Sequence, residues 1–275
     1  MLRCALSKRS LSSISTVLPG SCVLGEHWLS LPLLSKTPVN HDTSIFRFAL
    51  PDSNSPLNLS TCACILASTS ENEKNDIVRP YTPISTNSQL GSFELMVKIY
   101  PDGKLSQEMN NLQTGDTLDF KHIPFNVKIQ YPFNKRRIAM IVGGTGITPM
   151  IQALHAILDT DSDTTKVDLI YGSKSQDDIL GRQQIDEWAA KSNGQLDVHH
   201  ILSDEPAESD WTGQRGYVDE KVLKALLPLP EDDSGMIFVC GPPAMYENIC
   251  GDRTEENVTG ILEGMGFSAE HVFKF

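Results

Sequence analysis

Residues 138–150 read IAMIVGGTGITPM, and this stretch decides how the C-terminal half of the chain is interpreted. Its first five residues are apolar, a run of the length expected for a buried strand. Three glycines follow between positions 143 and 146, so we expect a sharp turn there. Thr148 is then expected to cap a helix that has Pro149 in its first turn. A strand, a glycine turn and a helix N-terminus together present free N–H groups to an anion, as in dinucleotide-binding domains.

Strand-like and helix-like segments alternate from this stretch to the C-terminus. The apolar runs lie at 167–172, 196–202 and 236–240, and the helical patterns at 180–191, at 219–227 and from residue 244 onward. This order predicts a doubly wound α/β domain with a parallel sheet. A second turn, Gly241-Pro242-Pro243, follows the last run. Because open parallel sheets bind ligands at the C-terminal ends of their strands, both turns are expected to face one crevice.

The pattern is different between residues 28 and 131, where short β-rich runs alternate with turn-forming loops. The runs are LSLPLLSKTPV (29–39), SIFRFAL (44–50), CACILAS (62–68), FELMVKIY (93–100), DTLDFKHI (116–123) and NVKIQY (126–131). They predict an antiparallel barrel or sandwich. Cys62 and Cys64 would share one face of the third run and pack in the core. The polar residues 132–137 then mark a boundary between two domains, 23–135 and 136–275.

Composition narrows the possible functions. With 40% hydrophobic and 21% charged residues, the chain has an ordinary globular composition. No apolar run approaches the ~18 residues of a membrane span, so we expect no transmembrane segment. The net charge of −12 argues against nucleic acid as a partner. The six cysteines form no CxxC pair and no metal-site spacing with histidine, so no metal is expected.

The N-terminal segment differs from the rest of the chain. It carries Arg3, Lys8 and Arg9 and six serines up to Ser21, and the first acid is Glu26. This composition is typical of a mitochondrial transit peptide. We therefore expect a cleaved presequence at 1–22 and a location in the mitochondrial matrix or intermembrane space. A disordered tail is the alternative interpretation.

Two motifs in the first domain suggest a dinucleotide ligand. In RPYTPIS (79–85), Arg79 can bind a phosphate through two parallel hydrogen bonds, and Tyr81, on the same strand face, can lie against a flat ring. An ordinary barrel strand with an exposed arginine is the alternative. GKLS (103–106) follows the fourth run and predicts a helix N-terminus suited to a diphosphate.

Four motifs occur in a fixed order: RPYTPIS, VKIYPDGKLSQ (97–107), GGTGITPM (143–150) and CGPPAM (240–245). In order and spacing they resemble the flavin reductases related to ferredoxin-NADP reductase, and most closely the NADH-cytochrome b5 reductases. The likeness extends from about residue 28 to residue 275 and is nearest to the plant and algal mitochondrial form. It implies an N-terminal antiparallel β-barrel that binds FAD and a C-terminal α/β domain that binds NADH.

The resemblance also implies roles for individual residues. The expected FAD site consists of Arg79, Pro80, Tyr81, Thr82, Val97, Lys98, Ile99, Gly103, Lys104, Leu105 and Ser106. The expected NADH site consists of Gly144, Thr145, Gly146, Thr148, Pro149, Asp204, Cys240, Gly241, Pro242 and Met245. Thr82, Lys98 and Cys240 would act closest to the reacting atoms, the first two beside the flavin and Cys240 beside the nicotinamide.

The activity implied is hydride transfer from NADH to FAD, followed by single-electron transfer to cytochrome b5 or a similar haem protein. A flavin reductase for another acceptor, such as an oxygenase or quinone, and a non-catalytic FAD-binding subunit are the alternatives.

By resemblance, Asp204 would face the adenosine ribose and favour NADH, whereas Ser173 and Lys174 could accept the phosphate of NADPH. A monomer is expected. The basic residues Lys121, Lys128, Lys135, Arg136 and Arg137 would either steer an acidic partner or form a solvated linker.

Overall fold

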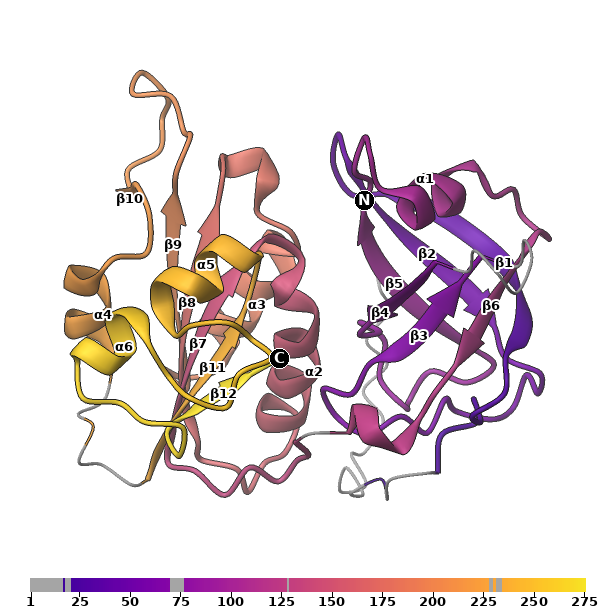
Figure 1. The fold of residues 1–275 in the computed structure, drawn as a ribbon, viewed down its shortest axis with the longest axis horizontal. Helices are drawn as coiled ribbons and strands as arrows, with labels where there is room; N and C mark the ends of the chain where they lie inside the picture. Colours follow the sequence, from indigo (N-terminus) through magenta and orange to yellow (C-terminus); the bar gives the residue numbers. More distant parts are fainter. Residues whose placement is uncertain (1–16, 18–20, 70–76, 128, 228–229, 231–233) are drawn as a thin grey trace.

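The computed structural model describes residues 17, 21–69, 77–127, 129–227, 230 and 234–275. The described chain forms two lobes, a barrel and an α/β lobe, which lie side by side in Figure 1. The expected presequence, 1–22, lies almost wholly outside the described residues. No helix in the described part has the length and apolar character needed to cross a bilayer.

The first lobe is a six-stranded antiparallel sheet that confirms the expected barrel. Its strands are β1 (Leu29–Pro38), β2 (Thr43–Ala49), β3 (Ile65–Ser68), β4 (Val78–Tyr81), β5 (Ser92–Lys98) and β6 (Thr117–Lys121), in the order β4-β3-β6-β1-β2-β5. The interior is aromatic: Phe48, Phe93 and Phe120 are fully buried, with ring centroids 4.7 to 5.9 Å apart. Helix α1 (Lys104–Asn111) covers one end of the barrel, and the turn η1 (Pro124–Asn126) follows β6.

Two expectations for this lobe are wrong. Cys62 and Cys64 do not share a strand face, because β3 begins only at Ile65 and Cys62 lies in a turn with φ of 65°. The run NVKIQY contains no strand in its described residues. Pro124 starts the turn η1, and β7 begins only at Arg137, so this segment forms the connection to the second lobe instead.

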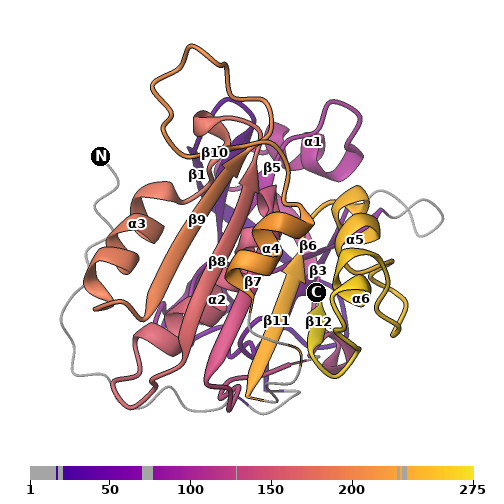
Figure 2. The ribbon, with the colours of Figure 1, turned by 90° about the vertical axis from the view of Figure 1, so that its left-hand side faces the viewer.

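The second lobe is the expected doubly wound parallel sheet. Its strands are β7 (Arg137–Gly143), β8 (Lys166–Ser173), β9 (Leu196–Leu202), β10 (Gln214–Arg215), β11 (Gly235–Cys240) and β12 (Val272–Lys274), in the order β10-β9-β8-β7-β11-β12. Its helices are α2 (Ile147–Leu158), α3 (Arg182–Lys191), α4 (Glu220–Leu226), α5 (Pro243–Ile249) and α6 (Gly260–Gly264), with short turns η2 (Gly144–Gly146) and η3 (Gln176–Asp178). Figure 2 shows the strands of this sheet running side by side.

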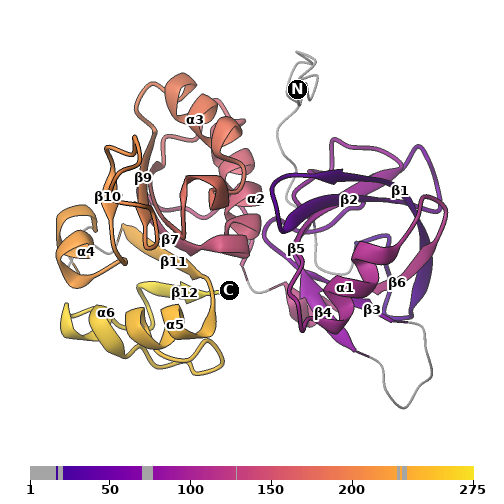
Figure 3. The same cartoon turned by 90° about the horizontal axis from the view of Figure 1, so that it is seen from above.

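Each face of this sheet has its own layer of helices, as Figure 3 shows from above. Met140 on β7 belongs to the core cluster shared with α2 and α3, and its neighbour Ile141 belongs to the cluster shared with α4, α5 and α6. Helix α2 lies next to the barrel, whose Met96 and Cys62 join the same core cluster. The helix that follows the glycine turn therefore forms much of the contact between the two lobes.

The start of α2 differs from the expectation in one detail. Thr148 is not the cap: it lies inside the first turn, and its hydroxyl donates a hydrogen bond to the carbonyl of Thr145 at 3.2 Å. The turn η2 leads directly into the helix, so no extended residue remains to act as a cap. Pro149 does lie in the first turn, where its missing N–H has no cost.

Candidate active site

A cleft of about 1840 Å³ lies between the two lobes and is lined by both. From the barrel it receives Arg79, Pro80, Tyr81, Thr82, Val97, Lys98, Gly103, Lys104, Leu105 and Ser106. From the α/β lobe it receives Gly144, Thr145, Gly146, Thr148, Pro149, Asp204, Cys240, Gly241, Pro242 and Met245. Ile99 is the exception among the expected site residues, since it packs against the barrel core instead. The cleft thus brings together segments far apart in the sequence, and the binding role of each residue stays a prediction.

The N-terminus of α1 points free donors at this cleft. Lys104, Leu105 and Ser106 form its first turn, so their N–H groups have no acceptor within the helix. The Ser106 hydroxyl accepts from the N–H of Tyr100 at 3.2 Å and donates to the carbonyl of Gly103 at 2.9 Å, which fixes the turn. A Cβ at Gly103 would lie 2.4 Å from that hydroxyl, so only glycine fits. This set of donors fits a diphosphate.

Arg79 and Tyr81 supply the other groups that an anionic dinucleotide with a flat ring would need. Arg79 is exposed and donates to the carbonyl of Val78 at 2.8 Å, and no carboxylate in the described part of the chain pairs with it. Burial raises the pKa of the Tyr81 phenol to about 12, so it remains a neutral hydrogen-bond donor. A free guanidinium, a half-buried aromatic ring and unpaired N–H groups along one cleft fit FAD.

Glycines allow the two turns of the α/β lobe to meet at this cleft. A Cβ at Gly146 would lie only 2.1 Å from the carbonyl oxygen of Cys240, at the end of β11. A Cβ at Gly143 or Gly241 would lie 2.7 or 2.5 Å from the sulfur of Met245. Gly144 differs, because its φ is +53° and no atom lies within 4 Å of the position of a Cβ. The β7–α2 and β11–α5 turns therefore pack together and face one crevice, with open space above Gly144.

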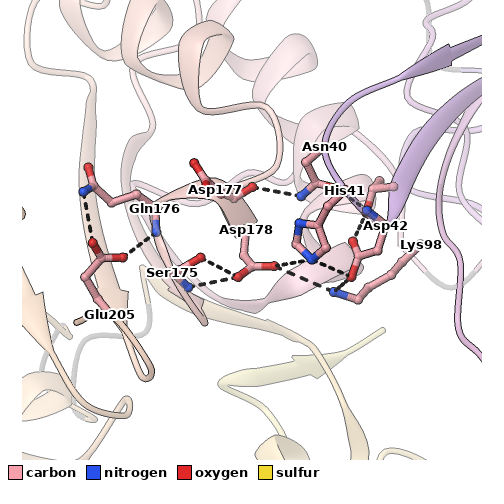
Figure 4. A network of polar contacts seen from close by, with 10 residues as sticks. Asn40, His41, Asp42, Lys98, Ser175, Gln176, Asp177, Asp178 and Glu205 are labelled. Atoms are coloured by element: carbon pink, nitrogen blue, oxygen red, sulfur yellow. Dashed lines mark hydrogen bonds and ion pairs between the residues drawn. The ribbon is translucent and has the colours of Figure 1, made fainter. Parts of the chain in front are cut away.

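Lys98 is bound into a polar network that the sequence did not reveal (Figure 4). Its ammonium lies 2.6 Å from a carboxylate oxygen of Asp42 and 4.0 Å from one of Asp178, which belongs to the other lobe. Burial opposes ionisation of Asp42, but its bonds to Lys98 and Thr43 outweigh this and hold its pKa below the usual range. Nearby, the amide of Asn40 donates to the carbonyl of Asp177 at 2.9 Å. Lys98 therefore links the lobes, and its charge in the cleft is shared with Asp42.

Asp204, Ser173 and Lys174 of the α/β lobe also line the cleft. The N–H of Asp204 donates to the carbonyl of Lys174 at 2.8 Å. Asp204, expected to favour NADH, and Lys174, which could accept the phosphate of NADPH, are therefore neighbours. Tyr217 also lines the cleft and is 75% exposed, although no sequence motif indicated it. The only signal for it in the sequence is the preceding Gly216, whose φ of +108° requires glycine.

Comparison with known proteins identifies the family. The oxidoreductase FAD-binding domain model matches residues 30–124, and the oxidoreductase NAD-binding domain model matches residues 140–251. NADH-cytochrome b5 reductase 2 of Scheffersomyces stipitis is 38% identical over 256 residues, covering 91% of this chain and 84% of that protein. The chain belongs to the NADH-cytochrome b5 reductase family. The predicted cofactors, FAD and NADH, are thereby confirmed.

Other members of this family and related structures agree. The NADH-cytochrome b5 reductase-like protein of Arabidopsis thaliana is 38% identical over 266 residues, covering 94% of this chain and 79% of that protein. The cytochrome b5 reductase domain of Ulva prolifera nitrate reductase superposes with a TM-score of 0.79 at 28% identity, covering 93% of this chain and all of that one. The CS-b5R domains of human Ncb5or give a TM-score of 0.74 at 26% identity, covering 91% and 70% of the two chains.

Of the basic residues that could steer a partner, those in the described part of this reductase-family chain do not line the cleft. Arg137 begins β7 and pairs with Asp168 at 2.7 Å, whereas the cleft-lining turn follows the opposite end of the same strand. Lys121 lies over the ring of Trp28, with its ammonium 4.4 Å from the centroid, and Lys128 lies outside the described residues. Arg137 is therefore separated from the glycine turn at the cleft by the length of a strand.

Cys240 is expected to act in this family site by contact and not as a nucleophile. Burial raises the pKa of its thiol to about 11, so it is protonated at neutral pH. We predict that its alkylation by iodoacetamide, measured by mass spectrometry, accelerates about tenfold per pH unit up to pH ~10 without reaching a plateau. Free N-acetylcysteine is the reference thiol. A plateau for Cys240 below pH ~9 would contradict this assignment.

Proposed function

We propose that this protein oxidises NADH and passes the electrons singly to cytochrome b5, using FAD bound in the barrel. The observation that carries the proposal is the single cleft, in which the α1 N-terminus and Arg79 of the FAD-binding domain face the glycine turns of the NAD-binding domain. Relatives that are 38% identical over most of this chain bear the name NADH-cytochrome b5 reductase, which supports the choice of acceptor.

The residues of the chain bind and orient the cofactors, and the cofactors carry out the chemistry. Bound FAD supplies a two-electron acceptor for hydride that can release electrons one at a time. Arg79 and the first turn of α1 would hold its diphosphate, and Tyr81 and Thr82 would border its ring. The turn at Gly144 would hold the pyrophosphate of NADH, and Thr148 and Cys240 would border the nicotinamide. Orientation of the two rings, not proton transfer by a side chain, is the contribution we assign to the protein.

Anaerobic mixing of the purified protein with NADH, followed by cytochrome b5, tests the proposal. We expect bleaching of the flavin absorbance and then reduction of the haem. Reduction of ferricyanide without reduction of cytochrome b5 would indicate a reductase for another acceptor. Protein that binds FAD but is not bleached by NADH would be a non-catalytic subunit, and protein unable to bind FAD would refute both enzyme assignments.

Asp204 is proposed to select NADH over NADPH. Its carboxylate would accept hydrogen bonds from the ribose hydroxyls and would repel a 2′-phosphate. We predict that Asp204→Ser raises kcat/KM for NADPH by roughly 10- to 100-fold and lowers it for NADH. Asp210→Ser is the matched control, because this acid lies in the same loop, accepts from Gln176 at 2.8 Å and does not line the cleft. Equal NADPH efficiency in the two variants would show that Asp204 does not face the ribose.

We further propose that residues 1–22 direct the protein to mitochondria, where it acts as a monomer in the matrix or intermembrane space. The basic, serine-rich composition of this segment supports the proposal. A fluorescent protein fused to residues 1–22 should enter mitochondria, and cytosolic fluorescence would refute the targeting role. Light scattering from the purified protein would determine its oligomeric state.

A further inference from the structure

Gln152 on α2 connects the α/β lobe to the barrel through two hydrogen bonds. Its side-chain nitrogen donates to the carbonyl of Pro83 at 2.7 Å and to that of Ser85 at 2.6 Å. A neutral amide nitrogen carries two N–H groups, so one side chain can serve both carbonyls. Gln152 itself is half-buried, and the contact involves no charge.

The segment that Gln152 holds is firmly attached to the barrel on its other side. The N–H of Ile84 donates to the carbonyl of Glu94 on β5 at 2.9 Å. The N–H of Glu94 in turn donates to the hydroxyl of Ser85 at 2.9 Å. Gln152 therefore binds a part of the barrel that its own sheet holds in place, and movement of α2 relative to the barrel requires these bonds to stretch or break.

This contact is next in the chain to residues that line the cleft. Thr148 is one turn before Gln152, and residues four apart share a helix face. Thr82, which precedes Pro83 in the chain, lines the cleft, as Thr148 does. A second contact occurs beside it, where the thiol of Cys62 donates to the carbonyl of Pro149 at 3.3 Å. The two bonds of Gln152 thus join the segments that would border the flavin and the nicotinamide.

We propose that Gln152 is a positioning residue that sets the distance between the nicotinamide-side turn of α2 and the flavin-side segment after β4. The inference rests on the proposed function, since it concerns the approach of the two rings. Hydride transfer depends steeply on that approach, and a displacement of about 1 Å can lower a rate about 100-fold. Gln152 does not line the cleft, so it would act by holding the two segments together.

The test compares Gln152→Met with Gln195→Met. Methionine keeps the approximate length of glutamine but removes its donors. Gln195 is the matched control, because its half-buried amide donates to the carbonyl of Asp163 at 2.8 Å within a single lobe. In anaerobic stopped flow we expect Gln152→Met to lower the limiting rate of flavin reduction by NADH roughly 10- to 100-fold. The NADH concentration at half-maximal rate and the oxidation of dithionite-reduced protein by ferricyanide should not change.

Alkylation of a buried thiol provides a readout that does not depend on activity. Cys62 of the barrel is buried against Pro149 of α2, so its thiol should react faster with iodoacetamide in Gln152→Met than in the unaltered protein, with no change in Gln195→Met. Unaltered alkylation of Cys62, or a limiting rate equal to that of Gln195→Met, would overturn the inference. If NADH fails to reduce the unaltered protein, the proposed function is refuted, and the alkylation measurement still decides whether Gln152 holds the lobes together.

Discussion

Replacement of Arg79 with alanine is expected to weaken FAD binding by roughly 100-fold, because two charge-assisted hydrogen bonds contribute about 3 kcal/mol. Arg79 lines the cleft, and its one hydrogen bond within the described chain is to the carbonyl of its neighbour Val78. The guanidinium is therefore free for a ligand, and its removal should leave the barrel folded. Titration of the apoprotein with FAD, followed by quenching of flavin fluorescence, measures the dissociation constant.

Two further variants test whether FAD binding depends on a positive charge at this position and on the planar shape of the guanidinium. Arg47→Ala removes an arginine from the same barrel, but Arg47 pairs with Glu94 at 2.8 Å and does not line the cleft, so FAD affinity should not change. Arg79→Lys retains the charge but loses the planar geometry, and an intermediate affinity is expected. If Arg79→Ala binds FAD as tightly as the unaltered protein, Arg79 has no part in the FAD site.

Sequence patterns predicted well those elements for which the hydrophobic pattern and the turn residues indicate the same boundaries. An apolar run followed by glycines located the end of β7 and the start of α2 to within a few residues, because both the burial and the turn are encoded locally. The strand expected over NVKIQY failed because its alternation of apolar and polar residues carries no information about a pairing partner. The short elements α6 and β12 were not predicted, since five- and three-residue segments contain less than two periods of any pattern.

In the site, too, features with a local sequence signal were predicted, and contacts between distant segments were not. Motif order was sufficient to place residues of two lobes around one cleft, since each motif spans the end of a strand and the residues that follow it. The contacts of Lys98 with Asp42 and Asp178 could not be predicted, because they depend on the packing of one lobe against the other. The same holds for Gln152, whose acceptors lie 69 and 67 residues away in the chain. Sequence patterns identified residues that line the cleft, and the structure identified those that hold the two halves together.

Gly146→Ala is expected to destabilise the protein by about 3 kcal/mol, since overpacking of this kind forces the backbone apart. The added Cβ would meet the carbonyl oxygen of Cys240 at 2.1 Å and its carbon at 2.5 Å. Both are backbone atoms at the end of a central strand, so neither can rotate away. The turn before α2 must then separate from β11. Urea unfolding should show a lower midpoint, and NADH binding should weaken because both turns line the cleft in which we place NADH.

Gly144→Ala, two residues earlier, tests ligand binding without disturbing the packing of the two turns. Here the cost to the fold is only the strain of an alanine at φ of +53°, about 1 kcal/mol, because no atom lies within 4 Å of the new Cβ. That open space is where we place the pyrophosphate of NADH, so the methyl group should weaken NADH binding at least about tenfold while the unfolding midpoint changes little. A variant that binds NADH normally would show that the pyrophosphate lies elsewhere in the cleft. Loss of NADH binding in both variants, with loss of stability confined to Gly146→Ala, would show that the two glycines serve different purposes: one allows the turns to meet, and the other leaves room for the ligand.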